Sequence, residues 1–223
     1  MGKFLCKHDR LKASIIFKSR EEWGNSVLRS EIIDNAIELF AQKSYFGCTL
    51  DELAKSVDIK KASLYYYFPS KAAIYRECTQ RCIDYFDRVI KVQKNKSAST
   101  LTLGNLKQFI LDTVFKTDIN YLRLYLQFTQ APDEFKEELY EGVSGLHEEL
   151  DDVFKRYYEA NDIEVSFKEY RELVLGVMES GFIRTTFINY FDELSYRRKT
   201  LKLDVANMLD SLFELNETVK ENQ

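Results

Sequence analysis

Apolar residues recur at intervals of three and four positions along most of this 223-residue chain, and alternating apolar patterns are nearly absent. Spacing of three and four places side chains on one face of an α-helix, whereas a half-buried β-strand requires alternation. Only 2 prolines and 8 glycines occur, too few for a turn-rich all-β protein. Hydrophobic residues make up 45% and charged residues 30%, a balance that supports a packed core. The sequence therefore predicts an all-α fold with short connections.

Several features bear on location and on the kinds of site that the chain offers. No apolar run approaches the roughly 18 residues that a membrane-spanning helix needs. Residues 1–12 contain lysines but no long apolar segment and no small-residue cleavage site, which disfavours a secretory signal. The four cysteines, at positions 6, 48, 78 and 82, show neither a C-x-x-C pair nor zinc-finger spacing. We expect a cytoplasmic protein with no metal site and no cofactor.

The two parts of the chain differ in the sign of their net charge. Residues 1–96 contain 18 basic and 12 acidic residues, a net charge of +6, whereas residues 97–223 contain 14 and 24, a net charge of −10. A basic segment favours a polyanionic partner, so we expect the first part to bind nucleic acid. The alternative is that two solvated surfaces differ in sign by chance.

Three helical patterns follow one another in the basic part. An amphipathic helix is expected over about residues 30–43. A capping box then begins a helix of barely two turns, with Thr49 as the cap and Glu52 reaching back to it. Asp58 suits a left-handed turn, because aspartate tolerates positive φ better than most residues. A third helix is predicted over about residues 60–66.

A long fourth helix follows this group. Pro69 ends the third helix, because proline bars the residue before it from the helical region. Ser70 is the expected cap of the fourth helix, which runs to about Gln93. Its apolar stripe consists of Ile74, Cys78, Cys82, Phe86 and Val89.

Two short helices joined by a tight turn form the helix-turn-helix plan. In this chain the plan resembles the DNA-binding domain of the TetR family of bacterial repressors. The resemblance covers about residues 29–75 and rests on four stretches: residues 32–40, 49–54, 61–68 and 70–71. It implies a three-helix DNA-binding domain, joined by a long helix to a helical domain that binds a ligand and forms a dimer. The predicted organisation is an N-terminal extension, a DNA-binding domain, a connecting helix and a ligand-binding and dimerisation domain, over residues 1–28, 29–75, 76–96 and 97–223.

The chain departs from the family pattern in three places. Asp58 stands where the family usually has a turn glycine, and Lys60 stands where it usually has a serine cap. Loss of a helix cap costs about 1 kcal/mol, which surrounding packing can absorb. In addition, roughly 25 residues precede the match. For this extension we considered a basic arm that enters a minor groove and an extra helix packed through Leu11, Ile15 and Ile16, and we favour the helix.

The resemblance implies a set of DNA-contacting residues on the third helix and around it. Lys61 and Ala62 are expected near base edges, and Tyr65 and Tyr66 at phosphates. Lys71 would hold the DNA backbone from the next helix, and Thr49 would present its hydroxyl and the helix-end amides to a phosphate. From the helical pattern alone, the exposed residues are Lys60, Lys61, Ser63, Tyr66 and Tyr67, with Leu64 and Phe68 in the core. The alternative is that the tyrosines are ordinary core and surface aromatics.

The remaining chain predicts five helices, over about residues 101–117, 119–129, 133–159, 167–190 and 196–217. The fourth of these is apolar on every side around its centre, which indicates burial on both faces. The last carries a heptad seam ending at Leu215. Together they suggest a four-helix dimer interface, as the resemblance also implies, with these candidate residues: Leu173, Val177, Gly181, Leu201, Val205, Met208 and Leu212. Gly176 and Gly181 permit close approach of helices.

Aromatic residues gather in the middle of the chain and suggest a pocket for a small hydrophobic or aromatic ligand. The candidate lining residues are Phe86, Phe109, Tyr121, Tyr125, Phe128, Tyr157 and Phe182. For any one of them, an ordinary place in the core is the better interpretation. The same holds for Cys78 and Cys82, which lie in an apolar stripe. His8 and His147 have no ligating neighbours and are expected at the surface.

The sequence contains no phosphate-binding glycine loop and no nucleophile motif, so we expect no enzyme. The favoured interpretation is a DNA-binding transcriptional regulator, a ligand-released repressor that binds a palindromic operator as a homodimer. The alternative is a TetR-like adaptor that acts on a protein partner, favoured if Asp58 and Lys60 have disabled the recognition helix. A helical enzyme or carrier that uses only the second domain is a third, weaker alternative.

Overall fold

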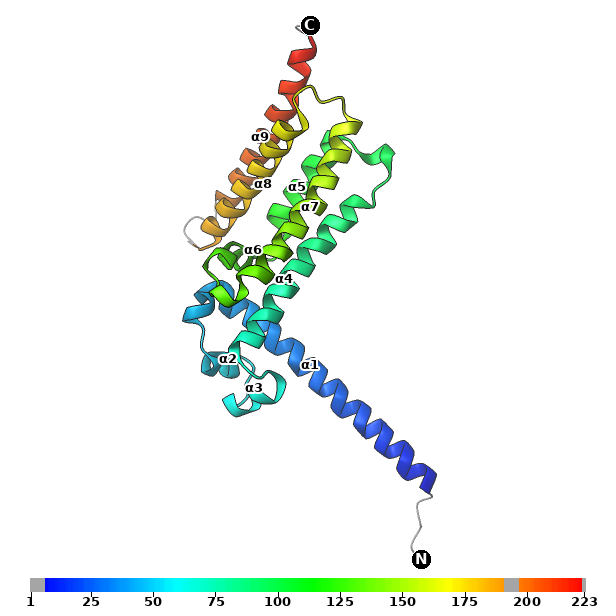
Figure 1. Cartoon of the computed structure of the whole chain (residues 1–223), viewed down its shortest axis with the longest axis vertical. Helices are drawn as coiled ribbons and strands as arrows, with labels where there is room; N and C mark the ends of the chain where they lie inside the picture. Colours follow the sequence, from blue (N-terminus) through cyan, green and yellow to red (C-terminus); the bar gives the residue numbers. More distant parts are fainter. Residues whose placement is uncertain (1–6, 191–196, 222–223) are drawn as a thin grey trace, which may run out of the picture. The chain divides into compact units, whose positions relative to one another are not determined.

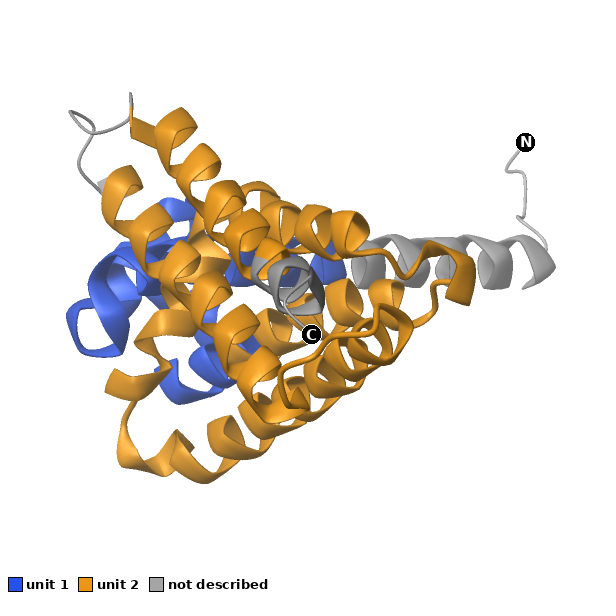
Figure 2. Cartoon of the chain, turned by 90° about the horizontal axis from the view of Figure 1, so that it is seen from above, with its two compact units in different colours: residues 1–78 blue, residues 79–223 orange. Residues whose placement is uncertain are grey.

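The computed structural model describes the backbone of residues 7–190 and 197–221, and the side chains of residues 25–189 and 197–214. Every regular element in these residues is helical, so the predicted all-α fold is confirmed (Figure 1). Within the same residues, no helix is long and apolar enough to cross a membrane. The chain divides into two compact units, residues 1–78 and 79–223 (Figure 2). The division falls inside α4 (Lys71–Lys94), close to residue 75, where the sequence predicted the end of the DNA-binding domain, and before residue 97, where it predicted the start of the second domain.

Unit 1 contains α1 (Lys7–Gly47), α2 (Leu50–Ser56), α3 (Lys61–Tyr67) and the beginning of α4. Its core is apolar and fully enclosed, as the spacing of three and four predicts. The Phe40 ring packs edge-to-face against Tyr75 of α4, with 5.0 Å between ring centroids. The buried residues that hold the four helices together are Ile32, Ile33, Ala36, Phe40, Leu53, Leu64, Phe68 and Ile74.

The predicted caps and turn of unit 1 are present. Thr49 and Glu52 form the reciprocal capping box of α2. Asp58 has φ 51°, the left-handed conformation expected of the turn between α2 and α3. The Ser70 hydroxyl accepts a hydrogen bond from the amide of Ala73 at 3.1 Å and so caps α4. Lys60 makes no side-chain hydrogen bond to α3 among the described residues, as its departure from the family pattern implied.

Two element boundaries in unit 1 differ from the sequence prediction. Helix α3 begins at Lys61, one residue later than expected. Helix α1 begins at Lys7 and includes most of the extension, which was expected to be an arm or a separate helix. Helical periodicity alone could not show that the two segments are continuous. The proposed packing of Leu11, Ile15 and Ile16 lies outside the described side chains, and the same holds for His8.

Unit 2 contains the rest of α4 and five longer helices: α5 (Leu103–Lys116), α6 (Ile119–Leu126), α7 (Lys136–Ala160), α8 (Phe167–Tyr190) and α9 (Arg198–Glu221). These correspond to the five predicted spans. The predicted helices extended too far at the end of α6 and at the start of α7, because short 3-10 segments occupy those positions. The 3-10 segments are η1 (Ala98–Thr100), η2 (Gln127–Gln130) and η3 (Asp133–Phe135).

Two glycines of unit 2 lie where helices approach closely. A Cβ atom on Gly142 of α7 would lie 2.4 Å from Cδ1 of Ile83 on α4. A Cβ atom on Gly181 of α8 would lie 3.0 Å from the Val114 methyl groups on α5. The predicted close approach at Gly181 is therefore a contact within the chain. Gly176 differs, because a Cβ atom there would meet nothing within 4 Å.

Candidate functional site

Helix α3 presents one face to solvent and anchors itself through the other. Leu64 is 1% exposed and Phe68 is 3% exposed, so the two residues fix the helix to the core of unit 1, as predicted. The side chains of the opposite face are exposed: Lys60, Lys61, Ala62, Ser63, Tyr65 and Tyr66. A helix of seven residues is too short to be stable alone, so this packing holds the exposed face in place.

The first exposed cation of α3 already has a partner. Lys61 Nζ lies 2.8 Å from an Asp51 carboxylate oxygen on α2. The hydrogen bond to Asp51 raises the pKa of the Lys61 ammonium. Since both side chains are exposed, the pair is weak and a phosphate or a base edge can compete for the lysine.

The three tyrosines of α3 differ in their surroundings. Tyr65 is 52% exposed and Tyr66 is 72% exposed, so neither belongs to the core. Tyr67 is half-buried, and its hydroxyl donates to Asn25 Oδ1 on α1 at 3.3 Å. Asn25 Nδ2 in turn donates to the Tyr66 hydroxyl at 3.2 Å. The helical pattern predicted that Tyr67 is exposed, and it gave no indication that Asn25 contacts the tyrosines.

Lys71 lies in the first turn of α4 and is half-buried. Its ammonium stands over the Tyr45 ring, 4.4 Å from the centroid. A cation over an aromatic face gains about 0.5–1 kcal/mol at an exposed site. This contact limits the directions that the lysine can take. It was not expected from the sequence, because the Tyr45 ring comes from the end of α1.

Thr49 is exposed at the start of α2, but its hydroxyl is engaged. The hydroxyl donates to Glu52 Oε2 at 2.9 Å and accepts from the Glu52 amide at 3.2 Å. Lys43 bonds the same carboxylate at 2.5 Å, and together with Thr49 it lowers the pKa of Glu52 to about 2. The carboxylate is therefore charged at neutral pH, and a phosphate near Thr49 would lie beside an anion that Lys43 compensates.

Unit 2 contains a small apolar cavity of about 40 Å³. A site for a drug-sized ligand measures about 300–1,000 Å³, so the cavity as it stands is too small for such a ligand. Four of the seven expected pocket residues line it: Phe86, Phe109, Tyr125 and Phe182. The other lining residues are Val89, Ile90, Thr113, Leu146, His147, Leu150, Met178 and Glu179.

The other three expected pocket residues are not among the lining residues. Tyr157 is fully buried, and its hydroxyl accepts a hydrogen bond from Gln93. Tyr121 stacks on the Tyr85 ring at 4.7 Å between centroids. Phe128 packs against the Tyr125 ring at 5.6 Å. All three lie on predicted helices, but aromatic spacing does not distinguish a cavity wall from ordinary core.

His147 was expected at the surface, and the structure places it half-buried, with one face at the cavity. Its Nε2 atom lies 3.5 Å from the Tyr125 hydroxyl at the cavity wall. Burial, together with the charge of Glu179, raises the pKa of Tyr125 to about 12, so the phenol stays protonated. The signal in the sequence was the position of His147 between Leu146 and Leu150, which lie on the buried stripe of α7.

A larger groove of about 360 Å³ lies between α4 and α5. It shares three lining residues with the small apolar cavity: Val89, Phe109 and Thr113. The two spaces are therefore separated by these side chains.

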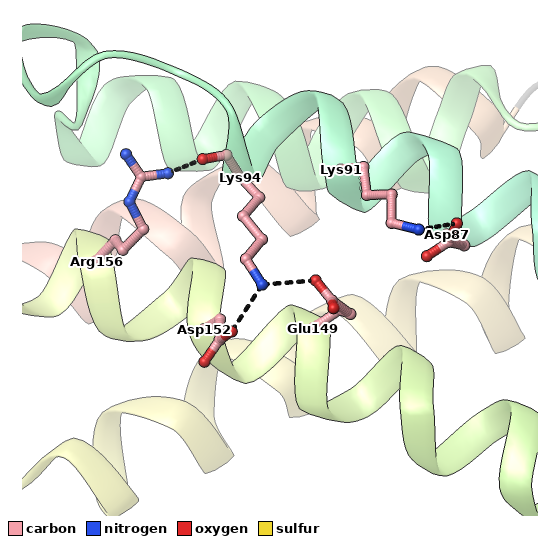
Figure 3. A network of polar contacts seen from close by, with 6 residues as sticks. All are labelled: Asp87, Lys91, Lys94, Glu149, Asp152 and Arg156. Atoms are coloured by element: carbon pink, nitrogen blue, oxygen red, sulfur yellow. Dashed lines mark hydrogen bonds and ion pairs between the residues drawn. The ribbon is translucent and has the colours of Figure 1, made fainter.

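A polar network connects the C-terminal end of α4 to α7 (Figure 3). Lys94 Nζ lies 2.8 Å from carboxylate oxygens of both Glu149 and Asp152. Arg156 donates to the carbonyl oxygen of Lys94 and, at 2.7 Å, to that of Lys96. Carbonyls at the end of a helix lack partners within the helix, so Arg156 supplies partners from outside it. This end of α4 is therefore fixed to α7.

The expected dimer residues fall into two groups. Val177, Leu201 and Val205 are buried within unit 2, and Gly181 contacts Val114 of the same chain. The seam that faces the chain's own core on α9 consists of Leu201, Val205 and Leu209, whereas Met208 is 42% exposed. Leu173 is also exposed, Leu212 is half-buried, and Leu215 lies outside the described side chains.

A second set of apolar side chains is exposed on α8. Ile183 and Phe187 are each 57% exposed and border an open groove of about 530 Å³ between α8 and α9. Arg184 and Asp204 form an ion pair across this groove at 3.0 Å. Exposed apolar groups gathered on one face mark interaction sites.

The cysteines of the α4 stripe belong to the core. Cys78 and Cys82 are fully buried and unbridged. Burial raises the pKa of the Cys82 thiol, so it is unreactive at neutral pH. The prediction of a core role for both is confirmed.

Comparison with known proteins agrees with this geometry. The family described as bacterial regulatory proteins, tetR family, matches residues 32–78, which include α2, α3 and the start of α4. The biofilm operon icaADBC HTH-type negative transcriptional regulator IcaR of Staphylococcus aureus is 34% identical over 183 residues. These are 82% of this chain and 97% of that protein. The chain belongs to the TetR family. It is a DNA-binding transcriptional regulator.

A second relative and two solved structures extend the comparison. IcaR of Staphylococcus epidermidis is 32% identical over 183 residues. The regulator FadR from Bacillus subtilis, solved in complex with stearoyl-CoA, superposes with a TM-score of 0.58 at 20% identity and covers 81% of this chain and 96% of its own. A regulator from Aquifex aeolicus superposes with a TM-score of 0.57 at 17% identity and covers 83% and 99%. At these identities the two structures show the common fold.

Proposed function

We propose that this TetR-family regulator is a homodimeric repressor that binds a palindromic operator through α3 and is released by a small hydrophobic ligand. The observation that carries the proposal is the exposed face of α3, where lysine, serine and tyrosine side chains stand over the Leu64 and Phe68 anchors. The negative regulator IcaR, which is 34% identical, supports repression as the outcome of binding.

The proposed DNA contacts divide by chemistry. Lys61, Ala62 and Ser63 lie at the start of α3, where they can reach base edges in a major groove. Tyr65, Tyr66, Lys60 and Lys71 are assigned to phosphates, which fix orientation without reading sequence. At Thr49 we assign the phosphate contact mainly to the backbone amides at the start of α2, because the threonine hydroxyl already binds Glu52.

DNA binding is tested by a gel shift of the full-length chain on duplex DNA from upstream of its own gene. Lys61→Ala and a mixed-sequence duplex are included in the same experiment. We expect specific binding to the upstream duplex, and we expect Lys61→Ala to lose specificity as well as affinity. Equal binding of wild-type protein to both duplexes would contradict sequence-specific regulation.

The proposed dimer uses the exposed face of α8 and α9. Leu173, Gly176, Ile183 and Phe187 lie at helical spacing on one face of α8, and Met208 is exposed on α9. Gly176 has open space around it, so a helix of a second copy can approach closely there. The buried Val177, Gly181, Leu201 and Val205 support this face from behind.

The proposed ligand site is the cavity beside Phe86 together with the adjoining α4–α5 groove. A site for a drug-sized ligand occupies about 300–1,000 Å³, so a ligand can enter the cavity only if its walls move apart. Phe86, Val89 and Ile90 of α4 form one wall, and the far end of α4 is held to α7 by Lys94 and Arg156. Entry of a ligand therefore favours tilting of α4 about that end. FadR, solved with stearoyl-CoA, makes acyl compounds reasonable probes.

A further inference from the structure

Asn25 lies between two tyrosine hydroxyls of α3. Its Nδ2 atom donates to the Tyr66 hydroxyl at 3.2 Å, and its Oδ1 atom accepts from the Tyr67 hydroxyl at 3.3 Å. Asn25 belongs to α1, so this contact joins two elements that lie 41 and 42 positions apart in sequence. The two rings also pack edge-to-face at 5.0 Å between centroids. One amide therefore sets the positions of both hydroxyl groups.

The direction of each hydrogen bond decides what each tyrosine can still do. A phenolic hydroxyl has one proton to donate and can also accept. Among the described side chains, Tyr66 accepts from Asn25 and donates to none, so its own proton is left for another acceptor, and its side chain is 72% exposed. Tyr67 uses its hydroxyl proton in the hydrogen bond to Asn25, and its side chain is half-buried. Non-bridging phosphate oxygens only accept, so Tyr66 is prepared to donate to DNA and Tyr67 is not.

We propose that Asn25 is a positioning residue for DNA binding, which directs the Tyr66 proton outward to a phosphate by occupying the acceptor side of that hydroxyl. This inference rests on the proposed DNA contact of α3. It assigns the phosphate contact to Tyr66 and removes Tyr67 from the predicted DNA-binding residues. It also gives the end of the N-terminal extension a role in DNA binding that does not require it to touch DNA.

The first experiment measures binding of the full-length chain to a mixed-sequence duplex by fluorescence anisotropy at several salt concentrations. Tyr66→Phe should lower affinity by about tenfold per half-site, the size of one hydrogen bond to a charged group. The salt dependence should not change, because a neutral hydroxyl displaces no counterion. Tyr67→Phe should leave affinity within about twofold. A larger loss for Tyr67→Phe than for Tyr66→Phe would overturn the assignment.

The second experiment is a double-mutant cycle between Asn25 and Tyr66. Asn25→Asp preserves shape but supplies only acceptors, so the Tyr66 proton turns inward and affinity falls by about tenfold or more. In a Tyr66→Phe background, Asn25→Asp should lower DNA affinity only through the repulsion between the new carboxylate and DNA. Added salt weakens this repulsion. An equal cost of Asn25→Asp in both backgrounds at high salt would show that Asn25 does not act through Tyr66.

Asn35→Ala is the matched control for this cycle. Asn35 lies on the same helix, and its amide donates to the carbonyl of Glu31 at 2.9 Å. It should leave DNA affinity unchanged, and circular dichroism should show the same unfolding midpoint for all variants within a few degrees. If wild-type protein binds no duplex, the proposed function fails. If wild-type protein binds and the cycle is additive, only the role of Asn25 fails.

Discussion

At the scale of single residues, Glu52 carries three hydrogen bonds at the junction of α1 and α2. They come from Lys43 at 2.5 Å and from the amide and hydroxyl of Thr49 at 3.0 and 2.9 Å. The pKa of Glu52 falls from 4.5 to about 2, with the Lys43 hydrogen bond as the first cause. A carboxylate whose pKa is lowered by folding stabilises the folded state above its unfolded pKa.

The stability that Glu52 contributes should therefore disappear as the pH falls from about 4.5 to about 2. We expect Glu52→Gln to be less stable than wild type at neutral pH and equally stable near pH 2. Urea unfolding of both proteins across this range measures the difference. A difference that stays constant with pH would mean that the charge of Glu52 does not stabilise α2.

Lys71 makes a prediction that separates a phosphate contact from a base contact. Its ammonium is held over the Tyr45 ring on unit 1. Lys71→Ala should weaken binding to all duplexes by the same factor and lower the salt slope by about 0.9 per protomer. Anisotropy titrations over a salt series measure both quantities. Lys136→Ala on unit 2 is the charge-matched control, and an unchanged slope for Lys71→Ala would remove this residue from the contact surface.

At the scale of helices, the sequence predicted elements well where a cap or a proline marks them. Thr49, Glu52, Asp58 and Ser70 each have a local role that spacing alone reveals. The start of α1 was missed, because no local signal separates a continuous helix from two helices in series. The place of His147 was missed because its neighbours in space, Tyr125 among them, come from other helices.

Helix α4 connects the two predicted activities because it begins at Lys71 and lines the cavity with Phe86. A ligand shifts the DNA-binding equilibrium only by its difference in affinity for the two positions of α4. Phe86→Ala enlarges the cavity, so a ligand can fit without moving α4. We expect Phe86→Ala to reduce the ligand-induced release of DNA more than it reduces the affinity for DNA.

The Phe86→Ala experiment uses stearoyl-CoA and 1-anilinonaphthalene-8-sulfonate as probes. Gel shifts with and without each probe give the DNA affinity and the release for wild-type and variant proteins. By linkage, DNA must weaken probe binding by the factor by which the probe weakens DNA binding. Equal loss of affinity and release would mean that Phe86 only stabilises the fold.

At the scale of the whole molecule, heptad spacing alone does not identify the surface of the proposed dimer. Leu201 and Val205 satisfy the seam pattern, yet both are buried within the chain. An apolar stripe in the sequence indicates that one face of a helix is buried, but it does not indicate which helix covers that face. In the same way, Leu173 and Ile183 belong to the segment that the sequence predicted to be buried on both faces, yet both are exposed in the chain, and Phe187 was found only from its exposure.

Ile183→Glu should convert the dimer to a monomer without unfolding it, because a charge on the exposed α8 face cannot be buried against a second copy. Leu203→Glu is the matched control, since Leu203 is 60% exposed on α9 and does not line the α8–α9 groove. Analytical ultracentrifugation of both variants measures the change. Dimers of equal strength in both variants would place the interface elsewhere.

The proposed function requires two copies of α3 to read successive turns of one face of DNA. Dimeric helix-turn-helix proteins place their half-sites about 34–36 Å apart, or a multiple of that distance. The most direct measurement selects a duplex for the full-length chain from a random-sequence pool and then inserts about half a helical turn, roughly 5 base pairs, between its half-sites. We expect a palindromic duplex, and we expect its affinity to fall to the mixed-sequence level when half a turn is inserted and to recover when a full turn is inserted. An affinity that does not depend on the spacing would contradict this expectation.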